Sequence, residues 1–376
     1  MKKTTLIPTK VPPLSRKIIL FAALALSLLF GIPKAHRFFS ERELFLCDQF
    51  QELQKTGKPT FMLVTHKPFF GEREFLRRCQ KALQNLGYPS FIQLMPEYAQ
   101  SAEDYSFVAK IYYRFIEWFL KPNVIFCAPA FYVHPFEAAR KYAFFTDYAN
   151  VAHVYLHSFN VIMMAAPDMR LCPDYAQKAN QTFIFDFYPT HPQTSYQESI
   201  PTKIYFGGNL WDEKRTSKAY KRLYKALDDS NNVTFTGPPK TWAGYKNYIG
   251  EIPFGGDKFL AVLKSCGIGL CLHSGRHLEY GTPTARIFEL AAAGVVIICD
   301  KHPFVVEHFK DSVLYIDTQS TDTTLEAQVF QHLAWIQNNP KEAQEKAKKA
   351  YDIVTRKWTL EYQLTRIIQD YTNSQS

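Results

Sequence analysis

The chain has 376 residues, of which 47% are apolar, so it is long enough for two domains of ordinary size with a large core. Its formal net charge is +9, but the first forty residues hold seven lysines and arginines and no acid. The remaining 336 residues carry only +2. This charge distribution argues against a protein whose folded body binds nucleic acid.

An uncharged apolar run fills residues 18–32, with Arg16 and Lys17 before it and Lys34 after it. Fifteen residues are short for a helix that spans a bilayer, and the flanking sequence offers no good small-residue cleavage site. We therefore expect an uncleaved signal anchor, single-pass or embedded, rather than a buried amphipathic helix. We expect the protein to contact the membrane through residues 18–32.

Two signals bear on the side of the membrane. The positive-inside rule places the basic N-terminus in the cytoplasm, and a full span would then export the body. Seven scattered cysteines without CxxC or metal spacing instead indicate a reducing compartment. An anchor embedded in the cytoplasmic leaflet satisfies both signals, so we expect a membrane-associated body that faces the cytoplasm.

After a basic segment (1–17), the anchor (18–32) and a predicted linker helix (33–56), apolar strand-like runs alternate with segments of helical length. Strands are predicted at 59–65, 90–95, 123–129, 152–158 and 181–187, with helices at 72–87 and 103–120. Such alternation predicts a mostly parallel sheet covered by helices on both faces. We expect a Rossmann-like domain over residues 57–187.

A polar, proline-rich stretch at 188–202 is the predicted interdomain linker, and the strand–helix alternation restarts after it. A second Rossmann-like domain is expected over 203–355, followed by a helix and tail at 356–376. The predicted fold class is therefore α/β, with two doubly wound domains and an N-terminal hydrophobic anchor helix. In such folds ligands bind beyond the carboxyl ends of the strands.

Two loops of the second domain carry the candidate ligand-binding residues. Gly207 and Gly208 follow its first strand and permit close backbone approach, while Lys214 and Arg215 open a predicted helix at 213–228. Helix-end amides, a lysine and an arginine suit a diphosphate. The alternative is a tight turn followed by an exposed basic helix face.

The second loop joins a strand to an apolar helix. His273 ends the strand, and Gly281, Thr282 and Thr284 lead into the helix, with Thr as the expected cap. Arg286 and Glu289 stand three residues apart on this helix and so share a face. A carboxylate beside helix-end amides suits the ribose and phosphates of a nucleotide, whereas a local Arg–Glu pair on a solvated face is the alternative.

This helix and its surroundings resemble the donor half of GT-B glycosyltransferases of group 1, similar to the spore-maturation-protein type. The resemblance rests on the stretch GTPTARIFELAAAGVVIICDKHPFVVEHFKDSVLYID. The family signature R-x-F-E-x-x-A-x-G corresponds here to RIFELAAAG. The resemblance implies that Glu289 holds the ribose of a nucleotide diphosphate sugar, the co-substrate, with Gly208 and Arg215 on the phosphate side. Retaining relatives carry two glutamates separated by seven residues, whereas Glu279 is displaced here, which leaves the stereochemical outcome open.

The expected activity is therefore metal-independent transfer of a sugar from a nucleotide sugar to a glycan, lipid or protein acceptor. A non-catalytic sugar- or nucleotide-binding protein and a nucleotide-sugar epimerase are the alternatives. For the base that deprotonates the acceptor, the first domain offers His66 and His157, because imidazole suits proton transfer at neutral pH. No tightly bound cofactor and no metal ligands are predicted.

Overall fold

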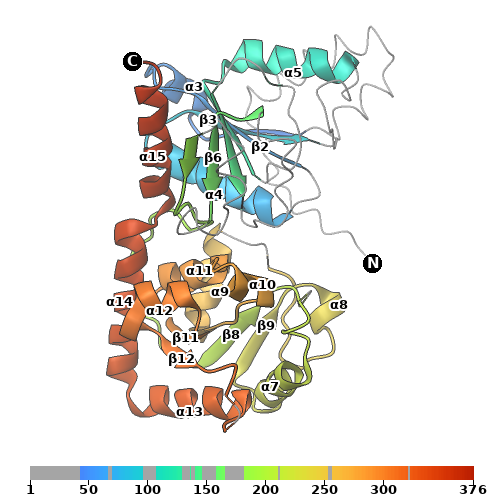
Figure 1. The fold of residues 1–376 in the computed structure, drawn as a ribbon, viewed down its shortest axis with the longest axis vertical. Coiled ribbons are helices and arrows are strands. Elements are labelled where there is room, and N and C mark those ends of the chain that lie inside the picture. The colour runs from blue at the N-terminus through green and yellow to red at the C-terminus, as the bar shows by residue number, and fades with distance from the viewer. Residues whose placement is uncertain are drawn as a thin grey trace.

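The computed structural model describes residues 43–66, 70–95, 107–128, 136, 140–145, 158–165, 182–210, 212–252, 256–320 and 322–376. Within this part, the chain forms two α/β lobes, each a mainly parallel sheet between helices (Figure 1). The predicted anchor at 18–32 lies outside the described residues and stays a prediction. Among the described helices, none has the length and apolar character needed to cross a membrane.

The sheet of the first lobe, as far as the chain is described, has the order β1-β3-β2-β4-β5-β6-β7, and only β1 is antiparallel. Its strands are β1 (Leu44–Leu46), β2 (Phe61–His66), β3 (Ser90–Met95), β4 (Val124–Cys127), β5 (Arg140–Phe145), β6 (Val161–Met164) and β7 (Thr182–Ile184). Apolar side chains of α4 (Phe70–Asn85) and α15 (Leu360–Asn373) cover one face. Those of α5 (Phe107–Leu120) and α3 (Phe50–Gln54) cover the other.

Two expectations for this lobe, and two strands that were not expected, need comment. A continuous linker helix over 33–56 is wrong in its described part, because Leu44 and Leu46 are buried on alternate positions of a strand that pairs with β3. The sequence patterns do not predict β5 and β6, since the aromatic residues around β5 also fit a buried helix face. The predicted strand at 152–158 lies outside the described residues, apart from Ser158.

The sheet of the second lobe is wholly parallel and has the order β12-β11-β10-β8-β9 in the described chain. Its strands are β8 (Lys203–Gly207), β9 (Val233–Thr236), β10 (Gly267–Cys271), β11 (Val296–Asp300) and β12 (Leu314–Ile316). The strand order reverses between β8 and β10. This reversal makes the carboxyl ends of β8 and β10 the expected ligand-binding edge.

Helices cover both faces of this second sheet. On one face lie α9 (Gly256–Cys266), α11 (Ala285–Ala293), α12 (Pro303–Phe309) and α14 (Pro340–Lys357). On the other lie α7 (Lys218–Asp229), α8 (Pro239–Trp242) and α13 (Leu325–Asn338). The short α10 (Gly275–Glu279) lies between β10 and α11. Because α9 and α11 share a core with α4, one hydrophobic cluster continues from lobe to lobe.

An aromatic cluster stabilises the junction of the lobes. Tyr188, in the connecting segment, stacks on Phe288 of α11 with 5.2 Å between ring centroids. It also meets Phe304 of α12 and Trp358, which lies between α14 and α15. Figure 1 shows α14 along the second lobe and α15 running on beside the first. The C-terminal helices therefore brace both lobes.

Gln363 of α15 fixes this junction by hydrogen bonding. Its side chain is fully buried; Oε1 accepts from Tyr188 N at 2.5 Å, and Nε2 donates to Thr190 Oγ1 at 2.8 Å and Tyr188 O at 3.1 Å. Gln363→Leu should lower the free energy of unfolding by about 2–3 kcal/mol, because buried backbone groups lose their partners. Urea unfolding tests this, with exposed Gln375→Leu as the matched control. Equal stabilities of the two variants would contradict the assignment.

Candidate active site

The loop after β8 approaches its neighbours closely. Gly207 has no room for a side chain, because a Cβ atom there would overlap the hydroxyl groups of Tyr205 and Thr236. Gly208 has φ +141°, a conformation that favours glycine, and open space lies where its side chain would be. Backbone atoms therefore form the surface at this edge of the sheet, as a loop that contacts a ligand through its main chain requires.

The segment after this loop differs from the predicted helix. The helix α7 begins at Lys218 rather than near residue 213. The cause is Asp212, whose Oδ1 accepts from the Arg215 amide and whose Oδ2 accepts from the Gly275 amide, both at 3.0 Å. Asp212 thus ties the loop after β8 to α10. The Arg215 amide is occupied by this bond, so its contribution to ligand binding would come from its side chain.

Lys214 and His273 meet at Asp300, the last residue of β11. His273 Nδ1 donates to Asp300 Oδ1 at 2.6 Å, the His273 amide donates to Oδ2 at 3.0 Å, and Lys214 Nζ lies 3.9 Å from Oδ2. His273 and Asp300 are almost completely buried. Burial would raise the pKa of the Asp300 carboxyl, but the electrostatic interaction and hydrogen bonds of His273, together with Lys214, hold it below its usual value. Asp300 is therefore an ionised anchor for the Lys214 ammonium and for the protonated Nδ1 of His273.

This arrangement leaves two buried nitrogen atoms available. Because His273 Nδ1 carries the proton donated to Asp300, its Nε2 faces outward from that bond. Neither His273 Nε2 nor Lys214 Nζ has a hydrogen-bond partner among the residues that the structure describes. Burial lowers the pKa of Lys214 despite its proximity to Asp300. Buried polar atoms are normally hydrogen-bonded, so these two mark a place where a polar ligand would be stabilised.

Two further histidines pack beside His273. The His302 ring stacks on it at a centroid distance of 4.1 Å, and the His277 ring meets it edge-on at 6.1 Å. His302 Nδ1 accepts from Phe304 N, so its proton lies on Nε2, which donates to His277 O. Burial, reinforced by His273, lowers the pKa of His302 to about 3 and that of His277 to about 4. Both rings are neutral supports at physiological pH.

The residues before α11 form the rim of the same edge. Gly281 adopts φ +63°, Thr282 is buried, and its Oγ1 has no hydrogen-bond partner in the described chain. Thr284 is the residue that caps α11, although its side chain makes no cap hydrogen bond. The first amides of a nine-residue helix thus lie directly behind Thr284.

Arg286 and Glu289 form a buried ionic group with a residue of the other lobe. Arg286 Nη1 lies 3.1 Å from Glu289 Oε2, and Nη2 donates to Gly207 O at 3.3 Å. Arg78, on α4, donates from Nη2 to Glu289 Oε1 at 2.6 Å. Burial would raise the pKa of the Glu289 carboxyl, but Arg286 and Arg78 hold it below its usual value. Glu289 therefore joins the lobes electrostatically.

The candidate bases lie in the first lobe. His66 ends β2, is fully buried, and shares its face of the sheet with Met62 and Val64. Their hydrophobic cluster also receives Tyr280 from the loop before α11, so the second lobe contacts this face of the first sheet. Burial lowers the pKa of His66 to about 4, which keeps the ring neutral at physiological pH. His157 lies outside the described residues and stays a prediction.

Sequence reasoning missed the residues that organise this edge. Asp212 and Asp300 orient the predicted cations, and Arg78 and His191 face Glu289 from the other lobe and the connecting segment. One signal was present: Asp300 ends a buried apolar strand, and a buried carboxylate requires a partner. The pairing of Arg78 with Glu289 joins positions 211 residues apart, which no local pattern reveals.

One set of described side chains could ligate a metal. Cys271, His273 and Cys299, on the neighbouring strands β10 and β11 and their ends, offer atoms within 4.8 Å of one another. Burial, followed by the effect of Cys271, raises the pKa of the Cys299 thiol well above its usual value. Metals bind the thiolate, and His273 Nδ1 is already engaged by Asp300. The group therefore fits a packed sheet interior better than a metal centre.

Comparison with known proteins agrees with this geometry. Residues 214–369 match the family described as "Glycosyl transferase-like". A glycosyltransferase from Rickettsia africae ESF-5 aligns with a TM-score of 0.54 at 12% identity, covering 84% of this chain and 98% of that one. Sucrose-phosphate synthase from Thermosynechococcus elongatus aligns with a TM-score of 0.51 at 9% identity, covering 84% of this chain and 100% of that one. A glycosyltransferase involved in avilamycin A biosynthesis aligns with a TM-score of 0.50 at 12% identity, covering 84% of this chain and 97% of that one. Among curated proteins, none matches this chain.

The family match covers the part of the second lobe that contains Lys214, His273, Arg286 and Glu289, and the solved structures share both lobes. The family match over residues 214–369 and the shared two-lobed GT-B fold support glycosyl transfer as the activity of this chain. The predicted α/β class with two lobes is thereby confirmed, and the predicted glycosyl transfer is supported, whereas the N-terminal anchor helix and metal independence stay predictions.

Proposed function

We propose that the enzyme transfers a sugar from a nucleoside diphosphate sugar that binds the second lobe, as in the group-1 enzymes similar to the spore-maturation-protein type. The observation that carries this proposal is the convergence of Lys214 and His273 on Asp300. It presents two buried nitrogen atoms without hydrogen-bond partners in the described chain at the carboxyl edge of the sheet. A nucleoside diphosphate sugar offers what both atoms require, namely phosphate oxygens for Lys214 Nζ and hydroxyl donors for His273 Nε2.

The roles follow from position. Lys214 and Arg215 would neutralise the diphosphate, with the Gly207–Gly208 main chain and the first amides of α11 behind Thr284 as further donors. Gly281 and Thr282 would form the rim of the donor site. Glu289 would accept from the ribose hydroxyls, which requires it to share its carboxylate with Arg78 and Arg286. Such positive groups stabilise the departing diphosphate, so we propose transfer without a divalent metal.

The acceptor would enter from the first lobe. Its hydroxyl oxygen attacks the anomeric carbon, the bond from that carbon to the diphosphate oxygen breaks, and the hydroxyl proton must pass to a base. His66 is our candidate for this base, because it ends β2 next to the topological switch point of the first sheet. Glu279 is exposed at the end of α10, so the family's paired-glutamate arrangement does not determine the stereochemistry here. Attachment to the cytoplasmic side of a membrane through residues 18–32 completes the proposal.

Titration calorimetry with a panel of nucleoside diphosphates, on the full-length protein, tests the donor site. We expect binding, and we expect Lys214→Gln to weaken it about tenfold or more, because a charge-assisted contact to phosphate is lost. The matched control is Lys221→Gln, an exposed lysine on α7. Unchanged affinity with added EDTA supports metal independence. Absence of nucleotide binding by folded protein, or equal losses in both variants, would refute the site.

A further inference from the structure

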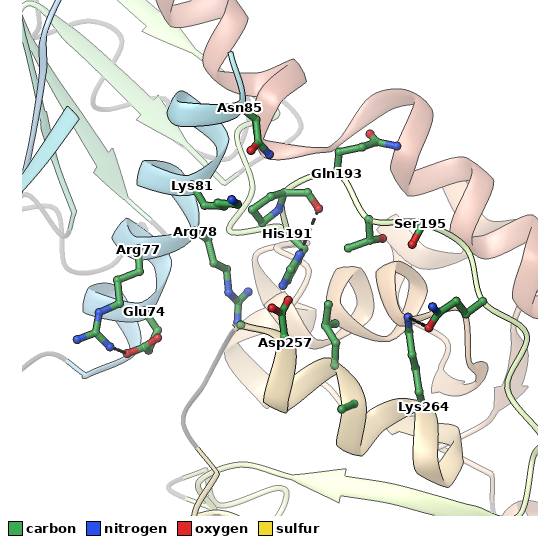
Figure 2. Close-up of a pocket in the computed structure, with 16 residues that line it drawn as sticks. Glu74, Arg77, Arg78, Lys81, Asn85, His191, Gln193, Ser195, Asp257 and Lys264 are labelled. Atoms are coloured by element: carbon green, nitrogen blue, oxygen red, sulfur yellow. Dashed lines mark hydrogen bonds and ion pairs between the residues drawn. The ribbon is translucent and has the colours of Figure 1, made fainter. Parts of the chain in front are cut away.

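A cavity of about 560 Å³ lies between the lobes, on the side of the connecting segment. Its walls come from α4 of the first lobe, from residues 191–197, and from α9 of the second lobe (Figure 2). Sites for small molecules typically have volumes of about 300–1,000 Å³. None of the predicted donor-binding residues lines this cavity, so it is a separate place in the molecule.

The cavity wall is rich in positive charge. Four basic side chains, Arg77, Arg78, Lys81 and Lys264, line it, against two acidic ones, Glu74 and Asp257. Arg77 pairs with Glu74, and Lys264 donates to the neutral Gln197 at 2.9 Å. Figure 2 shows Arg78 and His191 from opposite walls pointing toward Asp257 at the start of α9. The excess of positive charge indicates an anionic ligand.

Two buried atoms in this wall lack hydrogen-bond partners in the described chain: Arg78 Nε and His191 Nε2. Both side chains are more than nine-tenths buried. His191 Nδ1 lies 3.2 Å from Pro192 O, which can only accept, so Nδ1 carries the proton and Nε2 is an acceptor. Burial, followed by the charge of Arg78, lowers the pKa of His191 to about 4, so the ring is neutral. The wall therefore offers a cationic donor beside a neutral acceptor.

We propose that this cavity, here named the hinge cavity, binds a small phosphorylated sugar or polyol. Its phosphate would contact Arg78, Lys81 and Lys264, while hydroxyl groups would donate to His191 Nε2 and to the carboxylate of Asp257. An inorganic anion would engage only the three basic side chains, and an uncharged polyol would engage only His191 and Asp257. The combination of donors and acceptors selects a molecule that carries both groups.

Binding there would act on the donor site through Arg78. Its guanidinium lines the hinge cavity and also donates to Glu289 Oε1 at 2.6 Å. A phosphate in the cavity competes with Glu289 for that guanidinium and so frees one carboxylate oxygen for the ribose. This coupling rests on the proposed role of Glu289 in nucleotide binding, whereas the cavity site itself does not. By linkage, each ligand should then strengthen the binding of the other.

Calorimetric titration of the full-length protein with glucose 6-phosphate is the test, first without nucleotide. We expect saturable binding that is at least tenfold tighter than that of inorganic phosphate or sorbitol. Lys81→Gln and Lys264→Gln should each weaken it about tenfold, which corresponds to about 1.4 kcal/mol. Lys258→Gln is the matched control, because Lys258 is exposed on α9 but does not line the cavity.

Three results would overturn the proposal. The first is no binding of glucose 6-phosphate, and the second is an equal loss of affinity in the Lys258 and Lys264 variants. The third is a loss of affinity confined to Lys214→Gln, which would place the probe at the donor site. A second titration measures nucleoside diphosphate affinity with the cavity saturated, and an increase supports the coupling. Glucose 6-phosphate binding without any nucleotide binding would leave the cavity site standing and refute the proposed donor site instead.

Discussion

Glu289→Gln should lower the free energy of unfolding by about 3–5 kcal/mol and weaken nucleoside diphosphate binding at least about a hundredfold. The first effect follows because Arg78 and Arg286 would keep their charges in a buried place after losing the carboxylate between them. The second follows because an amide accepts ribose hydroxyls less strongly than a carboxylate. Urea unfolding and calorimetric titration measure the two effects separately.

A second substitution separates the ion pair from a general loss of packing. In Arg78→Met the guanidinium is removed but most of the side-chain volume remains. The double variant with Glu289→Gln should be less destabilised than the sum of the two single variants, with a coupling of about 1–3 kcal/mol. Exposed Glu345→Gln on α14 is the control and should leave stability and binding unchanged. Strict additivity would show that Arg78 and Glu289 do not interact in solution.

The pH dependence provides an independent check on the same group. The pKa of Glu289 is lower in the folded protein than its ordinary value of 4.5. The ionised form therefore stabilises the fold fully above pH 4.5, and this contribution is lost as the pH falls from there through the lower folded-state pKa. Glu289→Gln should lack this part of the acid destabilisation. The difference in unfolding free energy between the two proteins should accordingly shrink as the pH is lowered below 4.5.

The second lobe is the part of the fold that local sequence patterns describe best. Its strands are short apolar runs that end in polar or glycine residues, such as β8 before Gly208 and β10 before His273. The hydrophobic pattern and the turn residues therefore predict the same strand boundaries there. In the first lobe β1 and β5 escape prediction, because three residues or an aromatic-rich segment carry too little periodic information. Pairing with β3 and β4 decides their conformation, and that contact is not local.

The candidate site divides in the same way. The glycines, Lys214 and the Arg286–Glu289 pair lie beside strand ends or on a helix start, where sequence alone marks them. Arg78 borders the apolar stripe of α4 formed by Phe75, Cys79 and Leu83, and such a position also fits a solvated side chain. Only the docking of α4 on the second lobe buries it. The inter-lobe ion pair is thus a property of the tertiary structure.

Asp300→Asn is expected to reduce glycosyl transfer about a hundredfold or more and to lower the free energy of unfolding by about 2–3 kcal/mol. Asp300 accepts from both the amide and Nδ1 of His273, and its charge attracts Lys214. An asparagine has one acceptor oxygen, so one of the two His273 donors loses its partner or the ring changes tautomer. With the proton moved to Nε2, the ring would present a donor where the native ring presents an acceptor.

Nitrogen NMR of labelled His273 distinguishes these effects, since the two tautomers give different ring signals, and donor affinity measured alongside separates ground-state binding from turnover. Exposed Asp229→Asn on α7 is the control for loss of one carboxylate. If Asp300→Asn keeps the native tautomer and native turnover while losing only stability, Asp300 serves the fold alone. Loss of turnover together with a changed tautomer would instead show that Asp300 sets the tautomer of His273. The hydrogen bond that His273 offers to the bound donor would then depend on Asp300.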